Sequence, residues 1–81
     1  GNPSLVTVAA NIRTALPATN VQSVSESEIP GLYRFQAGDN TLYADSTGRY
    51  LLVGHIYDLQ GTQDVTEPNL PPSVYGQPAS Q

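Results

Sequence analysis

The chain has 81 residues, a net charge of −4, no lysine, no cysteine and a single histidine. Its length corresponds to one domain, and a domain this short buries only a modest fraction of its surface when it folds. The absence of cysteine excludes disulfides and thiol chemistry, and the single histidine argues against a metal site, so no cofactor is expected. The acidic balance argues against binding to nucleic acid, and no apolar run approaches the roughly 20 residues of a membrane span. Extra burial is therefore expected from self-association or from a neighbouring domain.

The first element that the sequence predicts is an amphipathic helix over residues 4–16. Ser4 is placed to accept a hydrogen bond from an unpaired amide of the first turn. Pro17 cannot continue the helix and disfavours helical backbone at the residue before it. The apolar side chains recur with the spacing of one helix face: Leu5, Val8, Ala9, Ile12 and Leu16.

Antiparallel strands are predicted after the helix, separated by turns rich in glycine, proline and asparagine. The expected strands are Val21–Ser25 at an edge, Leu32–Ala37, Leu42–Ala44 and Arg49–Leu59. In the second of these strands, Tyr33, Phe35 and Ala37 alternate onto one face. The stretch from Thr41 to Gly61 is the most apolar part of the chain, so the core is expected to form there.

Three glycines of this stretch are interpreted as structural: Gly48, Gly54 and Gly61. Gly48 belongs to the turn Ser46–Gly48, and a second turn is predicted at Ile29–Gly31, where proline fixes φ and glycine admits positive φ. Gly54 interrupts the last strand, which predicts a bulge or a close approach of another part of the backbone.

The sequence predicts an α+β fold, with the N-terminal amphipathic helix packed on a small curled antiparallel sheet. One face of that sheet is expected under the helix and the other uncovered. The composition changes at Thr62, after which the chain is rich in proline and has no hydrophobic period. Residues 1–61 are therefore interpreted as the folded domain and residues 62–81 as a proline-rich tail or linker.

No catalytic constellation is evident in the sequence, so no catalytic residue is expected and the chain is not expected to be an enzyme. His55 allows two interpretations, a pH-sensitive contact or a half-exposed strand residue beside a bulge, and the second is favoured. The five tyrosines fit a sheet with buried rings and wet hydroxyls, or a binding surface.

The edges of the predicted sheet are not guarded against pairing with another strand. Proteins protect such edges with lysine or inward charges, but this chain has no lysine and Val21–Ser25 carries no charge. The sequence also holds more apolar surface than one short helix can cover. A symmetric homodimer is predicted by edge pairing, with Val21–Ser25 or Leu32–Ala37 at the seam. The predicted interface residues are Val21, Val24, Leu32, Tyr33, Arg34 and Tyr43.

The residues from Ser4 to Gly61 resemble the N-terminal domain of periplasmic disulfide isomerases of the DsbC/DsbG type. The resemblance is carried by the order and spacing of Leu42-Tyr43, Asp45, Gly48, Gly54, Tyr57-Asp58 and Gly61. It implies a small cystatin-like α+β module that dimerises the isomerase. In that family the paired modules form the floor of an apolar cleft that holds misfolded substrates, and a helical linker leads to a thioredoxin-like domain with a Cys-x-x-Cys site.

The sequence departs from this pattern at two places. Thr47 stands where the family commonly has aspartate, which a turn tolerates. The segment after Gly61 is broken by prolines instead of forming an evident helix. Isomerase activity is therefore not carried over to this chain.

Two functions follow from the resemblance. The first is a non-catalytic dimerisation and substrate-holding module of a periplasmic thiol-disulfide isomerase. The alternative is a stand-alone adaptor of a bacterial envelope assembly, such as a secretion or conjugation apparatus. The expected partners are a second copy, an unfolded protein or an envelope complex. A cystatin-like protease inhibitor is a weaker interpretation, because Val21-Gln22-Ser23-Val24 has no glycine in the place that the inhibitory loop requires.

Overall fold

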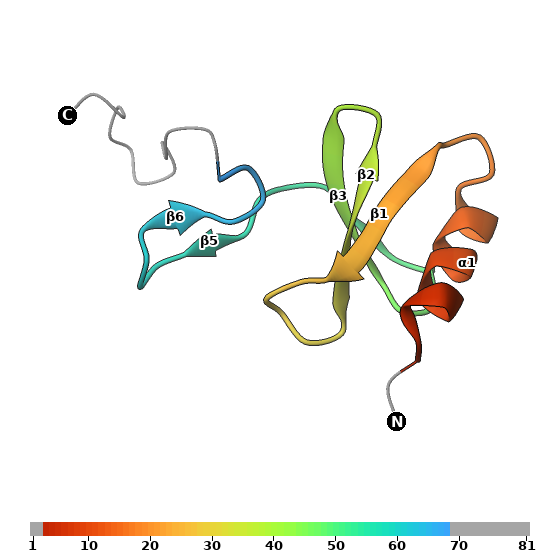
Figure 1. Cartoon of the computed structure of the whole chain (residues 1–81), viewed down its shortest axis with the longest axis horizontal. Helices are drawn as coiled ribbons and strands as arrows, with labels where there is room; N and C mark the ends of the chain where they lie inside the picture. Colours follow the sequence, from red (N-terminus) through yellow and green to blue (C-terminus); the bar gives the residue numbers. More distant parts are fainter. Residues whose placement is uncertain (1–2, 69–81) are drawn as a thin grey trace.

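In the computed structural model, which describes residues 3–68, one α-helix precedes six short β-strands (Figure 1). The elements are α1 (Leu5–Ala15), β1 (Val21–Glu26), β2 (Leu32–Ala37), β3 (Asn40–Asp45), β4 (Leu51–Leu52), β5 (Tyr57–Asp58) and β6 (Gln63–Asp64). Strands β1 to β4 form an antiparallel meander in chain order, while β5 and β6 pair as a separate hairpin. The predicted α+β class is confirmed.

Helix α1 begins and ends where its capping residues predict. The Ser4 hydroxyl accepts a hydrogen bond from the Thr7 amide at 3.2 Å, which satisfies one of the unpaired donors of the first turn. At the other end the Leu16 amide still donates to the Ile12 carbonyl at 2.9 Å, and Pro17 follows. The helix therefore spans the apolar stripe that the sequence indicates.

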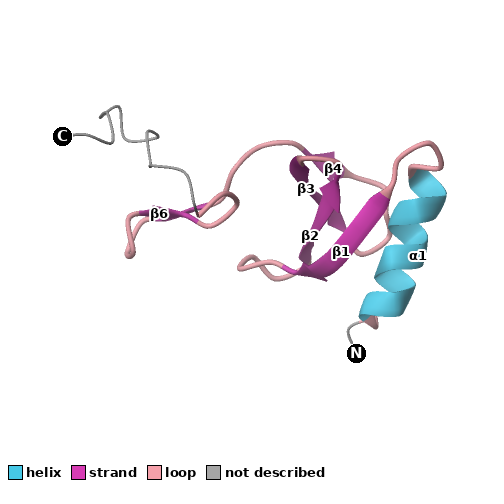
Figure 2. Ribbon diagram, turned by 45° about the horizontal axis from the view of Figure 1, so that its top comes forward, coloured by secondary structure: helices cyan, strands magenta, loops and turns pink. Residues whose placement is uncertain are grey.

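Helix α1 lies along one face of the meander (Figure 2), and the core is formed by side chains between the two. Val8 and Ile12 of the helix pack against the β2 residues Tyr33 and Phe35, and Phe35 is fully buried. Burying a side chain of this size stabilises the fold by about 1.5–3 kcal/mol relative to leaving it exposed. The buried cluster consists of Val8, Ile12, Val21, Tyr33, Phe35 and Ala44.

The apolar stretch after the β3–β4 turn does not form this core, contrary to the sequence prediction. Leu51, Leu52 and Val53 remain 49%, 44% and 75% exposed. The predicted strand Arg49–Leu59 is also divided, because only Leu51–Leu52 pair with β3 and Tyr57–Asp58 pair with β6. The chain thus leaves the first sheet after β4 and begins a second one.

Gly54 lies in the segment that crosses between the two sheets and not within a strand. Its backbone does not have positive φ, and a Cβ built on it would meet nothing nearer than a Leu52 side-chain carbon at 3.9 Å. The predicted bulge or close backbone approach is therefore absent at Gly54.

The β5–β6 hairpin lies on the side of the sheet opposite α1 (Figure 1 and Figure 2). It carries the fold past Gly61, where the sequence placed the start of a tail: Asp64 and Thr66 are each only 7% exposed. It also covers part of the face that was expected to be open, since Tyr43 on that face is fully buried. The rest of the predicted tail, residues 69–81, lies outside the described residues.

Candidate functional site: sheet edges and a polar bridge

The predicted interface residues lie in very different surroundings. Val21, Tyr33 and Tyr43 are 3%, 4% and 0% exposed, so their side chains are used inside the monomer. Val24, Leu32 and Arg34 are half-buried. This burial removes Val21, Tyr33 and Tyr43 from any side-chain contact with a partner.

Strand β2 does not provide a free edge for pairing. It lies between β1 and β3 and is hydrogen-bonded to both, which excludes Leu32–Ala37 as the seam. Strand β1 is an edge, as predicted, but its register is broken between Gln22 and Ser25, and Ser23 has φ of 57°. A bulge of this kind blunts an edge strand against regular pairing.

The side chain of Arg13 binds one backbone carbonyl of the edge strand β1. Its Nη2 and Nε atoms donate to the Val21 carbonyl oxygen at 3.0 and 3.3 Å. That acceptor is therefore already satisfied within the monomer. The bulge and this contact together leave only the later part of β1 free for another strand.

Strand β4 forms the opposite edge and is the more apolar of the two. Within residues 3–68 it pairs with β3 alone, through Leu51 opposite Ala44 and Leu52 opposite Tyr43. The guanidinium of Arg49 lies over the Tyr50 ring, 5.1 Å from its centroid. Exposed apolar side chains are adjacent along this edge: Tyr50, Leu51, Leu52 and Val53.

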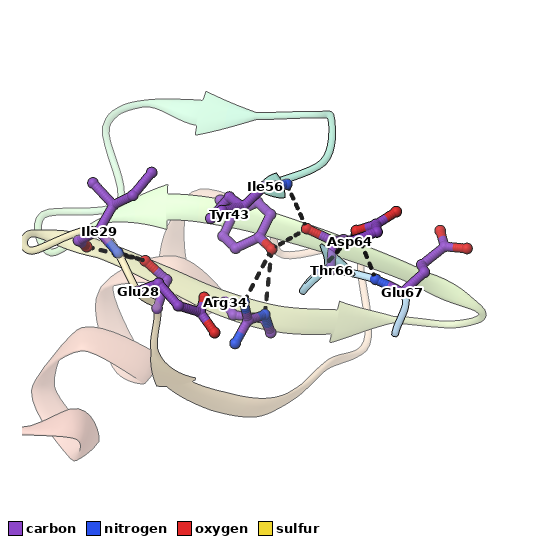
Figure 3. A network of polar contacts seen from close by, with 9 residues as sticks. Glu28, Ile29, Arg34, Tyr43, Ile56, Asp64, Thr66 and Glu67 are labelled. Carbon is purple, nitrogen blue, oxygen red and sulfur yellow. Dashed lines mark hydrogen bonds and ion pairs between the residues drawn. The ribbon is translucent and has the colours of Figure 1, made fainter. Parts of the chain in front are cut away.

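A polar bridge connects the sheet to the β5–β6 hairpin, and we use this name for Arg34, Tyr43, Ile56 and Thr66 (Figure 3). The Tyr43 and Thr66 hydroxyls are hydrogen-bonded to each other. Thr66 Oγ1 also accepts from the Ile56 amide at 2.8 Å, while Nε and Nη2 of Arg34 both donate to the Tyr43 hydroxyl at 3.3 Å. One buried tyrosine thus orients the hairpin relative to the sheet.

Arg34 is fixed at the outer end of the polar bridge. Its Nη2 atom forms an ion pair with Glu28 at 2.5 Å. Burial alone lowers the pKa of Arg34, but the hydrogen bonds to Tyr43 and Glu28 outweigh it and raise that pKa above its ordinary value. The guanidinium therefore remains charged and held in place.

His55 lies next to two carboxylates of the hairpin. Its Nδ1 atom is 2.8 Å from Asp64 Oδ2, and its Nε2 atom is 3.9 Å from Glu67 Oε1. Its side chain is 38% exposed, which agrees with the half-exposed position expected, although it lies outside any strand. Residues 3–68 hold no cluster of three or more side chains suited to a metal ion.

Sequence reasoning missed the exposed edge at β4 and the structural role of Thr66. The signal for the edge was the excess of apolar residues over what one helix can cover. For Thr66 there was no signal, because its partners Tyr43 and Ile56 are 23 and 10 positions away in the chain.

The fold defines this chain as a small α+β module with an exposed apolar edge strand. The model of one protein family, the disulfide bond isomerase protein N-terminal domain, matches residues 2–67, and the chain belongs to this family. The resemblance seen in the sequence is thereby confirmed. No curated protein matches the chain. Among the described residues, no helix is long and apolar enough to cross a membrane.

Proposed function

We propose that this chain is a non-catalytic module that joins two copies of its parent protein. The family of disulfide isomerase N-terminal domains supports an association role. The chain itself has no cysteine, and disulfide exchange requires a thiolate. The observation that carries the proposal is the apolar edge at β4, because an edge strand of exposed leucines, followed by the exposed Val53, favours pairing with another strand.

The seam that we propose is β4 against β4 of a second copy. Two identical strands that pair antiparallel are related by a two-fold axis, so the contact is self-complementary. Leu51, Leu52 and Val53 would lose their exposure in such a contact. This seam replaces Leu32–Ala37, and it is better suited than the bulged edge at Val21–Ser25.

We further propose that the dimer holds unfolded protein in the periplasm. It is supported by the family, whose paired modules the sequence resemblance associates with an apolar cleft. Localisation to the periplasm has the same support.

Sedimentation velocity at tens of micromolar tests the seam. We expect the chain to sediment as a dimer and the variant Val53→Lys to sediment as a monomer, because lysine blocks edge pairing. Val53 is 75% exposed, so this substitution leaves the monomer folded. The matched control is Val6→Lys on α1, where valine is 82% exposed.

The outcome that contradicts this seam is a dimer that persists in Val53→Lys or is lost in Val6→Lys. A monomeric parent chain at these concentrations would contradict self-association altogether. In that case the adaptor of an envelope assembly becomes the better function. It is favoured by two sheet edges, each of which pairs with one neighbouring strand in the described part of the chain.

A further inference from the structure

A groove of about 440 Å³ separates the β1–β2 connection from the β5–β6 hairpin. Ile29 contributes to one wall, and the other wall comes from residues at least 27 positions later in the chain, among them Ile56, Leu59 and Val65. Ile29 and Leu59 are 47% and 73% exposed. Two large apolar side chains are thus left in contact with water on opposite walls of one groove.

The walls are held in position by hydrogen bonds that do not depend on a ligand. The Ile56 amide donates to Thr66, and the Val65 amide donates to the Ile56 carbonyl at 2.9 Å. On the other wall, the Ile29 amide donates to the Ser27 hydroxyl at 3.0 Å. These bonds shape each wall, and the polar bridge, together with the ion pair at its outer end, joins the two walls, so the groove is preformed and the entropic cost of binding is lower.

The charged residues that line the groove are acidic. Glu28 lies on one wall and Asp58 on the other. The chain has no lysine or arginine after Arg49, whereas Asp58, Asp64 and Glu67 all lie in the hairpin region. Arg34 is the nearby cation, and its guanidinium is already bound to Glu28 and Tyr43.

We propose that this groove binds a short extended segment of a partner protein that carries large apolar side chains flanked by arginine or lysine. The apolar side chains would bury Ile29 and Leu59, and a basic side chain would be attracted by Asp58, because Glu28 is already paired with Arg34. An acidic segment of the same shape would be repelled. The groove does not include Leu51, so this site goes beyond the proposed dimer seam and does not depend on it.

An NMR titration of the ¹⁵N-labelled chain with two synthetic peptides tests the site. The peptides are acetyl-Ser-Arg-Leu-Phe-Arg-Ser-amide and the same sequence with both arginines replaced by glutamate. We expect saturable shifts at the Ile29, Leu59 and Val65 amides with the basic peptide only. Raising the salt concentration should weaken this binding, because exposed charges are screened.

Variants that remove one charge separate the electrostatic contribution to peptide binding from the contribution of the groove's shape. Asp58 Oδ1 accepts from the Gln60 and Gly61 amides at 3.0 and 3.1 Å, and asparagine retains that acceptor. We therefore expect Asp58→Asn to stay folded and to weaken binding of the basic peptide about fivefold, the effect of one exposed charge pair. Asp39→Asn, at an exposed turn position that does not line the groove, should leave the affinity unchanged.

The proposal is overturned if both peptides bind equally, if neither saturates, or if the shifts fall at Leu51 and Leu52 instead. It is also overturned if the Ile29 and Leu59 amides shift with protein concentration alone, because a second copy would then occupy the groove. Val53→Lys keeps the two proposals distinct. That variant should lose the dimer and still bind the basic peptide.

Discussion

At the scale of single residues, Gly48 is the position where the backbone conformation most strongly requires glycine. It has φ of +76°, and a Cβ built on it would lie 2.6 Å from the Asn11 carbonyl oxygen of α1. The Asn11 side-chain amide also donates to the Ser46 carbonyl at 2.9 Å, which holds this turn against the helix. We expect Gly48→Ala to lower the free energy of unfolding by about 2–4 kcal/mol, measured by urea denaturation.

Substitutions at two other glycines separate the two contributions to this loss of stability, the positive φ and the steric clash of a Cβ with α1. Gly38 has φ of +64° with nothing within 4 Å, so Gly38→Ala should cost about 1 kcal/mol. Gly54 has neither feature, and Gly54→Ala should change stability by less than about 0.5 kcal/mol. Equal losses at Gly48 and Gly38 would show that α1 moves aside and that the close approach carries no cost.

At the scale of elements, the attachment of the β5–β6 hairpin to the sheet depends on the hydroxyl of Thr66. Thr66→Val keeps the side-chain shape but removes the acceptor of the Ile56 amide and the partner of Tyr43. An unsatisfied buried amide costs about 1–3 kcal/mol. We expect faster hydrogen exchange at the Ile56 and Val65 amides, with little change at Phe35, because β2 is paired on both sides.

The matched control for this variant is Thr14→Val, at an exposed position of α1. A double-mutant cycle with Tyr43→Phe isolates the hydroxyl pair, and we expect a coupling of about 0.5–3 kcal/mol because the two groups share one hydrogen bond. Uniformly faster exchange through β2 and the hairpin would contradict the idea that Thr66 acts on the hairpin alone.

The elements that the sequence predicts well are those fixed by neighbours in the chain. The helix follows from its apolar stripe, with Ser4 and Pro17 at its ends, and the β2–β3 pair follows from alternation across a turn at Gly38. The division of the expected strand Arg49–Leu59 does not have such a local cause. It arises where the Ile56 amide pairs with Thr66 instead of with β3.

The sequence predicted that the sheet would have an unguarded edge, but it did not predict which strand forms the apolar edge. Unguarded edges and excess apolar surface indicate a strand-mediated contact from composition alone. Which edge is free depends on the sheet order, and which side chains are buried depends on the hairpin that covers Tyr43. The sequence left buried rings and a binding surface both open for the tyrosines; Tyr33 and Tyr43, which it assigned to the interface, are buried, whereas Tyr50 is exposed.

At the scale of the whole molecule, the four-stranded sheet separates two unlike sides. Phe35 packs under α1, whereas Tyr43, one strand away on the other face, contacts Thr66 of the hairpin region; both aromatic side chains are fully buried. The hairpin region carries Asp58, Asp64 and Glu67 without lysine or arginine, and Arg34, which reaches that side from β2, is paired with Glu28. Stability and recognition on that side therefore depend on how its carboxylates are paired.

Two of the carboxylates make the stability of the whole molecule sensitive to acid. Burial raises the pKa of Asp64, but hydrogen bonds from the Glu67 amide, His55 and the Thr66 amide outweigh it, so the pKa is lowered overall. The Thr47 hydroxyl and the Tyr50 amide, which donate to Asp45, likewise lower the pKa of Asp45.

A carboxylate whose pKa is depressed in the folded state stabilises the protein above its unfolded pKa of about 3.9, and this contribution is lost as pH falls through the folded pKa. The free energy of unfolding should therefore decrease between pH 5 and pH 3. Asp64→Asn should be less stable than the parent at pH 7, yet lose less between pH 5 and pH 3, in urea denaturation followed by circular dichroism. Adding Asp45→Asn should flatten the dependence further, since the two carboxylates share no hydrogen-bond partner. If Asp64→Asn were to lose stability as steeply as the parent chain, the acid sensitivity would have to come from other groups.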